Sequence, residues 1–177
     1  MKDLLIGQRI VLRKAKKTDL LDIFEAVYGD EKLLETMYME FSPDLASAKA
    51  RLDRTIAFQQ DKYLYFCALR ETDQVIGLGG MIENAPNEYA EAGLAIGRKF
   101  QHQGYGKEML ALLLDEAFRN LHAERFVYEC MTHNAPSKAL AAHFGFTYLS
   151  SHNEIRPRDK KPFIIETYTL TREAYLL

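Results

Sequence analysis

An alternation of elements in the second half of the chain limits the fold more than any other feature. Residues 88–97 have the pattern of a strand, residues 104–120 have the apolar spacing of an amphipathic helix, and residues 125–132 form a second apolar strand-like run. Two strands joined through a whole helix are normally parallel, because the helix returns the chain to the edge where it started. The sequence therefore predicts a β-α-β unit with one parallel strand pair.

Segments on both sides of this unit predict further strands and helices. Residues 63–70 and 74–83 are strand-like runs joined by a short link, so we expect an antiparallel pair that continues into residues 88–97 as a meander. Ahead of them, Thr18 or Asp19 can cap a helix. The predicted strands are 9–13, 63–70, 74–83, 88–97, 125–132, 145–152 and 163–170, and the predicted helices are 18–28, 45–60, 104–120 and 134–143.

Length and composition predict a single folded domain over residues 1–177. The chain has 177 residues, of which 47% are hydrophobic, close to the globular average. Its formal net charge of −2 creates no general field for nucleic acid or anionic lipid. No apolar stretch approaches the ~20 residues that cross a bilayer, and the start lacks a secretory-signal pattern. We therefore expect a cytoplasmic protein without a nucleic-acid or membrane partner.

The cysteines and histidines do not predict a metal site. Cys67 and Cys130 each lie in an apolar run without a cysteine or histidine at ligand spacing. We expect both to be buried as small hydrophobic residues in a reducing compartment. The five histidines form no helical pair at ligand spacing, so we expect no metal.

The turn at residues 101–107, Gln-His-Gln-Gly-Tyr-Gly-Lys, lies between a strand and the long helix. Glycines let the backbone approach a ligand closely, and the unpaired N–H groups at a helix start suit a phosphate. The turn lacks the third glycine of a dinucleotide-binding fingerprint and the glycine spacing of a P-loop. From these residues alone, a ligand site and an ordinary tight turn both remain open.

Three blocks of sequence resemble one known family. Ala95-Ile96 followed by Gln101-x-x-Gly104-x-Gly106 and a helix is similar to the acetyl-CoA motif of the GCN5-related N-acetyltransferases (GNAT). Residues 134–137 (Asn-Ala-Pro-Ser) and 144–146 (Phe-Gly-Phe) resemble the blocks that follow the second parallel strand in that family. Residues 9–13 and Asp19 resemble the start of the ribosomal-protein N-terminal acetyltransferase (RimJ/RimL-like) subgroup. The resemblance spans nearly the whole chain and is loose between Tyr28 and Tyr63, where the acceptor would be recognised.

The resemblance implies an α/β (α+β) GNAT fold. We expect a mixed, mostly antiparallel sheet of about six or seven strands with a splayed central parallel pair, flanked by about four helices. It also implies acetyl-CoA (coenzyme A) as co-substrate. Carried over residue by residue, the cofactor-binding residues are Leu94, Ala95, Ile96, Gln101, His102, Gln103, Gly104, Tyr105, Gly106, Lys107 and Asn134.

The transfer of an acetyl group to an amine needs a base for the amine, a donor for the oxyanion and an acid for the leaving sulfur. The resemblance assigns the base to Glu91, with Glu83 and Glu129 as alternatives and a solvated strand carboxylate as the non-catalytic interpretation. The family's tyrosine position, seven residues after the asparagine, holds Ala141 here. Ser137 is therefore the candidate acid, although a serine at a helix start can also satisfy backbone donors.

The resemblance implies an enzyme, an acetyl-CoA-dependent N-acetyltransferase whose amine acceptor is a protein amino terminus or a small molecule such as a polyamine. A non-catalytic acyl-CoA sensor and a structural interaction module remain alternatives. Between Asp19 and Asp44 there are eight acidic residues against one basic residue, Lys32. Such a stretch favours a cationic acceptor nearby, or forms only the solvated faces of two helices. The sequence leaves a monomer and a homodimer equally open.

Overall fold

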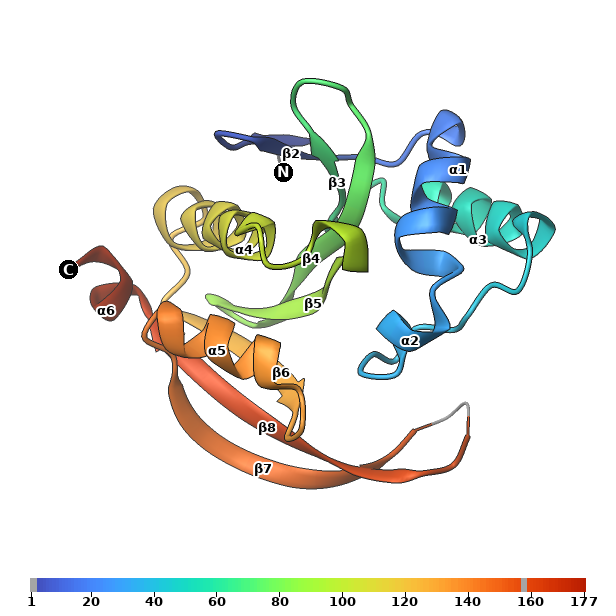
Figure 1. The fold of residues 1–177 in the computed structure, drawn as a ribbon. Coiled ribbons are helices and arrows are strands. Elements are labelled where there is room, and N and C mark those ends of the chain that lie inside the picture. Colours follow the sequence, from blue (N-terminus) through green and yellow to red (C-terminus); the bar gives the residue numbers. More distant parts are fainter. Residues whose placement is uncertain (1–2, 157–158) are drawn as a thin grey trace. The chain divides into compact units, whose positions relative to one another are not determined.

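The computed structural model describes residues 3–156 and 159–177, and its strands form one mixed sheet in the order β1-β2-β3-β4-β5-β6-β8-β7 (Figure 1). The pairs β1–β2, β2–β3, β3–β4, β6–β8 and β7–β8 are antiparallel, and β5–β6 is parallel. The strands are β1 (Leu4–Ile6), β2 (Ile10–Arg13), β3 (Tyr63–Leu69), β4 (Val75–Ala85), β5 (Glu88–Ile96), β6 (Arg125–Met131), β7 (Thr147–Ile155) and β8 (Pro162–Thr171). The predicted antiparallel hairpin and parallel pair are both confirmed.

The α-helices in the described residues are α1 (Leu20–Ile23), α2 (Glu31–Leu34), α3 (Leu45–Phe58), α4 (Tyr105–Asp115), α5 (Ala135–His143) and α6 (Arg172–Leu176). The helix expected over residues 18–28 consists of a 3-10 turn, α1 and a π-helical segment, Phe24–Tyr28. A π-helical segment, Glu116–Asn120, also follows α4. The fold class is confirmed, with eight strands and six α-helices in the described part, where six to seven strands and about four helices were expected. β1, α2 and α6 are only three to five residues long, too short for hydrophobic periodicity to reveal.

The chain divides into two compact units, and the first consists of residues 1–82 and 92–113. Asp44 begins α3 by accepting a hydrogen bond from the Ser47 backbone N–H at 2.7 Å. Buried residues of the segment 15–34, α3 and the sheet share one core, which includes Val27, Leu52 and Phe66. α4 packs on the opposite face of these strands, where Met109 lies against Gly79. The sheet of this unit is thus covered on both faces.

The second unit consists of residues 83–91 and 114–177. The rings of Phe126 and Tyr128 on β6 pack against Phe146, with centroids 6.2 and 5.6 Å apart. The parallel register of β5 with β6 covers Glu88–Ala90 against Arg125–Val127. Beyond that point β6 continues its antiparallel pairing with β8 as far as Met131.

The two cysteines and the apolar character of the helices can be compared with what the sequence predicted. Cys67 and Cys130 are both buried and carry free thiols, as expected for small hydrophobic residues. Burial raises the pKa of the Cys67 thiol to about 12. No helix among residues 3–156 and 159–177 combines the length and the apolar character that a bilayer crossing requires.

Candidate active site

The turn between β5 and α4 leaves three N–H groups unpaired at the helix start. The first intrahelical bond runs from the Glu108 N–H to the Gly104 carbonyl oxygen at 3.1 Å. The backbone N–H groups of Tyr105, Gly106 and Lys107 precede it, and they have no acceptor among the described residues. Gly104 has φ +86°, in the left-handed region that favours glycine, and a Cβ on Gly106 would meet no atom within 4 Å. This arrangement offers donors and open space to an anionic ligand.

Side chains on both sides hold this turn in place. The Gln101 amide donates to the Ile96 carbonyl oxygen at 2.9 Å, which fastens the turn to the end of β5. Arg9 donates to the Gln103 carbonyl oxygen at 2.8 Å, and its guanidinium lies 4.7 Å from the centroid of the Tyr105 ring. The turn is therefore ordered by contacts that reach back to the amino-terminal segment.

Glu108 connects the first turn of α4 to the start of β2. Its carboxylate accepts hydrogen bonds from the Arg9 backbone N–H at 2.7 Å, from the Arg9 side chain at 3.0 Å and from the Ile10 N–H at 3.3 Å. Burial alone would raise the pKa of this carboxyl, but the hydrogen bonds from Arg9 and Ile10 outweigh it and lower the pKa. The ionised form of Glu108 therefore stabilises the turn that precedes it.

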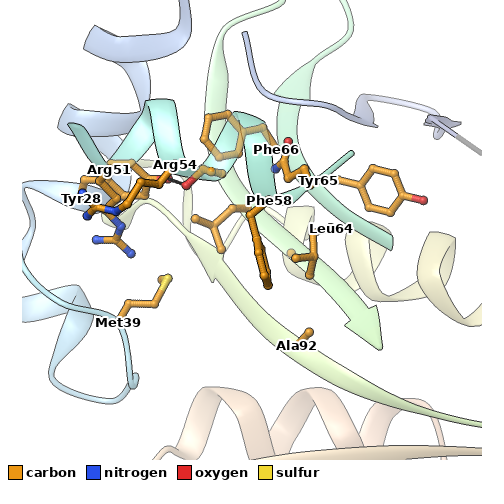
Figure 2. Close-up of a pocket in the computed structure, with 13 residues that line it drawn as sticks. Tyr28, Met39, Arg51, Arg54, Phe58, Leu64, Tyr65, Phe66 and Ala92 are labelled. Carbon is orange, nitrogen blue, oxygen red and sulfur yellow. Dashed lines mark hydrogen bonds between the residues drawn. The ribbon is translucent and has the colours of Figure 1, made fainter. Parts of the chain in front are cut away.

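A cavity of about 510 Å³ lies in the first unit, between α3 and the strands β3, β4 and β5. Figure 2 shows Phe58 of α3 and Leu64 of β3 on the side of the cavity that faces Ala92 of β5, with Arg51 and Arg54 to one side. The Tyr28 hydroxyl and the Thr55 hydroxyl are 3.1 Å apart in its wall.

Strand β5 is irregular beside this cavity. Ala92 lines the cavity, whereas Leu94 lies on the other face, where a Cβ added to Gly79 would contact both Leu94 and Met109 of α4. Residues two apart on a regular strand share a face, so the strand changes face between them. Gly93 occupies that position with φ +101°, a conformation that a residue with a Cβ rarely adopts.

In the second unit, Asn134, Ser137, Tyr128 and Glu91 act on one another. The Asn134 side chain accepts a hydrogen bond from the Ser137 backbone N–H at 3.2 Å and so caps α5. Because Asn134 makes this cap, the Ser137 hydroxyl is not needed for it. The Ser137 side chain is instead a hydrogen-bonding neighbour of the Tyr128 phenol, and the Glu91 carboxylate acts on the same phenol. The two residues expected to be catalytic thus converge on Tyr128.

Tyr128 is a candidate site residue that the sequence interpretation did not name. Its side chain is buried, and that burial, together with the charge of Glu91, raises the pKa of the phenol far above its usual range, although Ser137 lowers it in part. The phenol is therefore protonated at neutral pH. A tyrosine in the middle of an apolar strand was the available signal, because a buried phenol hydroxyl needs a partner. Ala141, where the family has its tyrosine, is fully buried.

The alternative carboxylates lie in different surroundings from Glu91. Glu91 is partly buried, whereas Glu83 and Glu129 are exposed. Glu129 accepts a hydrogen bond from the Thr167 hydroxyl at 2.9 Å, across the β6–β8 pair. Among the described residues, no group of three histidine, cysteine, aspartate or glutamate side chains is arranged to hold a metal ion.

Several of the acidic residues between Asp19 and Asp44 have structural partners. Asp19 pairs with Arg13 at 2.8 Å, and Asp30 pairs with Arg98 at 2.6 Å. Asp22 accepts a hydrogen bond from the Val75 backbone N–H, and Asp44 caps α3. The acidic stretch therefore serves partly to fasten this segment to the rest of the unit.

Comparisons with known proteins identify the class to which this fold and these residues belong. Residues 9–147 match the family model described as an acetyltransferase (GNAT) domain, and the chain belongs to this family. Among curated proteins, it is 28% identical over 148 residues to the uncharacterized N-acetyltransferase p20 of Bacillus licheniformis, with 80% of this chain and 81% of that protein covered.

Solved structures share the fold at low sequence identity. A GCN5-related N-acetyltransferase from Brucella melitensis superposes with a TM-score of 0.85 at 16% identity, covering 99% of this chain and 81% of that one. A GNAT-family acetyltransferase from Bacillus anthracis gives 0.83 at 15% identity, covering 96% and 99%. The structure titled RimL, a ribosomal L7/L12 alpha-N-protein acetyltransferase, gives 0.79 at 19% identity, covering 97% and 95%.

Proposed function

We propose that residues 1–177 form one N-acetyltransferase domain that transfers an acetyl group from acetyl-CoA to a primary amine. The observation that carries the proposal is the set of unpaired N–H groups at the start of α4, after a Gln-x-x-Gly-x-Gly turn, in a chain that matches the GNAT family over residues 9–147. Both compact units contribute residues to the matched region.

The residues around the turn are suited to acetyl-CoA. The backbone of residues 101–107 would hold the diphosphate, because unpaired N–H groups and the positive end of the helix favour an anion. Leu94, Ala95 and Ile96 would offer their strand backbone to the pantetheine arm, and Asn134 would hydrogen-bond to it. The open space around Gly106 fits this role, since no side chain fills it.

Acetyl-CoA would supply an activated acyl group, and the chain supplies the proton transfers. Glu91 takes the proton from the amine, directly or through one water. Ser137 donates its hydroxyl proton to the departing sulfur and is reprotonated by Tyr128, and the Tyr128 phenol takes up in turn the proton that Glu91 removed from the amine, directly or through one water. A backbone N–H near Ile96 stabilises the developing oxyanion. The roles of Glu91, Ser137 and Tyr128 in this proposal are supported by the influence of Glu91 and Ser137 on the Tyr128 phenol.

The acceptor is a protein amino terminus in this proposal. An α-amino group, with a pKa of about 7.7 to 8.0, is far more often neutral at pH 7 than a lysine amine near 10.4, so it needs only a weak base such as Glu91. A solved structure with the same fold is titled an alpha-N-protein acetyltransferase. A polyamine acceptor would need a stronger base.

Release of free thiol from acetyl-CoA, measured with peptides, polyamines and aminoglycosides in parallel, tests the proposal. We expect thiol release and a mass increase of one acetyl group on peptides. Gly106→Ala should keep the stability of the fold, because its Cβ enters open space, but weaken acetyl-CoA binding about tenfold or more, since that space is where the diphosphate lies. Cofactor binding without transfer to any amine would identify a sensor instead. Unchanged acetyl-CoA affinity in Gly106→Ala would overturn the assigned diphosphate site.

A further inference from the structure

The cavity beside α3 has a positively charged wall. Arg51 and Arg54 both line it, and none of its lining residues is acidic. In the part of the chain that the structure describes, neither guanidinium has a carboxylate at ion-pair distance. A wall of this kind disfavours a cation and favours an anionic group.

Arg51 is held in place without a counter-charge. Its guanidinium lies 3.9 Å from the centroid of the Tyr28 ring, and one of its N–H groups donates to the Glu40 main-chain carbonyl oxygen. Burial lowers the pKa of this guanidinium, the Tyr28 side chain and the Glu40 carboxylate raise it, and the charge of Arg54 lowers it again. Because Arg51 is already oriented, little of its side-chain entropy would be lost on binding a carboxylate. The Glu40 carboxylate is exposed and acts on Arg51 only at longer range.

Apart from the two arginines and a few polar groups such as the Thr55 hydroxyl and the Gln59 amide, the cavity lining is mostly apolar, and it includes a residue of β5. Met39, Phe58 and Leu64 line it, and Phe58 is 60% exposed. An exposed aromatic ring at a cavity is a natural contact for an apolar part of a ligand. Ala92 of β5 also lines the cavity, two residues before Leu94, to which we assign a cofactor contact.

The volume of the cavity favours a ligand larger than a single amino acid. At about 510 Å³ the cavity is within the range of about 300–1,000 Å³ that is usual for sites of drug-sized ligands. A peptide amino terminus of two or three residues fits this size better than a free amino acid does.

From these observations we infer that the cavity binds the acceptor and selects amines that carry a carboxylate, in the form of a peptide amino terminus with an acidic side chain in its first residues. Arg51 and Arg54 hold the carboxylate, and Met39, Phe58 and Leu64 contact the apolar part. This inference rests on the proposed acetyl transfer and names the class of its acceptor. It also opposes the expectation of a cationic acceptor drawn from the acidic stretch.

Three amidated peptides that differ only at their second residue, Glu, Gln or Lys, test the inference, with acetyl-CoA as donor and thiol release as readout. Amidation leaves the Glu side chain as the only carboxylate. We expect kcat/KM for the Glu peptide to exceed that for the Gln peptide about tenfold, because the Glu side chain would form a charge-assisted hydrogen bond. The difference between the Glu peptide and the Lys peptide should be larger. The carboxylate could also belong to a free amino acid. Free phenylalanine, which has a carboxylate, and phenylalanine amide, which lacks one, test this alternative.

Matched variants test whether a preference for the Glu peptide arises from the arginines of the cavity. Arg54→Gln should raise KM for the Glu peptide about tenfold more than it raises KM for the Gln peptide. Arg54→Glu should reverse the preference in favour of the Lys peptide. Lys49→Gln is the control, because it removes one positive charge from the same helix at an exposed position paired with Asp53, outside the cavity lining.

The outcomes separate this inference from the proposed function. Equal kcat/KM for the three peptides, or an equal loss on all of them in Arg54→Gln, would overturn the inference while acetyl transfer stands. A preference for free phenylalanine over the Glu peptide would replace the peptide acceptor with an amino acid. If no amine is acetylated, calorimetric titration of the Glu and Gln peptides decides: selective binding of the Glu peptide supports the anionic site without catalysis, and no binding overturns both.

Discussion

The Tyr128 hydroxyl is the single group on which the proposed chemistry of the second unit depends. Ser137 reaches it from α5 and Glu91 acts on it from β5, while Phe146 packs against its ring. Because burial raises the pKa of the phenol, the hydroxyl is protonated at neutral pH and holds a proton that it can pass to Ser137. Ser137 would then donate its proton to the sulfur and receive a proton from the Tyr128 hydroxyl.

Replacement of Tyr128 by phenylalanine tests this role. Tyr128→Phe should lower kcat about tenfold to a hundredfold, as expected when a proton-transfer partner is lost, with little change in KM for acetyl-CoA. Steady-state kinetics over a range of pH measures both. Ser137→Ala should give a similar loss, and the double variant should lose little more, because the two hydroxyls act as one unit. Additive losses would contradict a shared role.

At the scale of elements, the proposed anion site at the start of α4 lies in a turn that is fastened to β2. The Glu108 carboxylate accepts hydrogen bonds from Arg9 and Ile10, and Arg9 also holds the Gln103 carbonyl. A contact of this kind positions the unpaired N–H groups without occupying them.

Glu108→Gln should lower the free energy of unfolding by about 1 kcal/mol at neutral pH, because a neutral amide accepts weaker hydrogen bonds from Arg9. The pKa of Glu108 is lowered in the folded state, so its contribution is complete above the ordinary glutamate value of about 4.3 and is lost as the pH falls through the folded value. Urea unfolding of both proteins at several pH values measures the difference. A gap that stays constant down to pH 3 would show that the charge of Glu108 is not its source.

At the scale of the whole molecule, the amino-terminal segment is tied to the first unit by a buried ion pair. The Arg13 side chain, 9% exposed, binds Asp19 at 2.8 Å and Asp73 at 2.7 Å. It joins β2, the 3-10 turn before α1 and the link between β3 and β4. Asp19, which the sequence suggested as a helix cap, therefore serves as a buried counter-charge.

Asp19→Asn should destabilise the protein by about 3–5 kcal/mol, because it removes one partner of a buried pair and leaves the guanidinium less compensated. Denaturant unfolding followed by circular dichroism gives the change. Asp53→Asn is the matched control, since Asp53 pairs with Lys49 at the surface and should cost less than about 1 kcal/mol. Similar losses in the two variants would contradict a special role for the buried pair.

The sequence by itself determined the β-α-β unit and the glycine turn, because these features depend on local spacing: apolar residues at strand and helix periods, and glycines at a strand-to-helix junction. The family was inferred from the resemblance of three sequence blocks to known motifs. The short elements β1, α2 and α6 escaped prediction because three to five residues do not establish a period. Glu91 and Ser137 were named from resemblance, and their catalytic roles remain predictions.

Only the tertiary structure decided what those residues meet. Tyr128 is brought near Ser137 by the packing of α5 on β6, and near Glu91 by the three-residue parallel register of β5 with β6. The local propensities of these segments predict neither contact. The same holds for the cavity, whose lining contains Arg51 and Arg54 but none of the acidic residues of the stretch between Asp19 and Asp44. Contacts between segments that are distant along the chain depend on which faces of the helices and strands pack together. That packing is a property of the folded molecule and not of any local stretch of sequence.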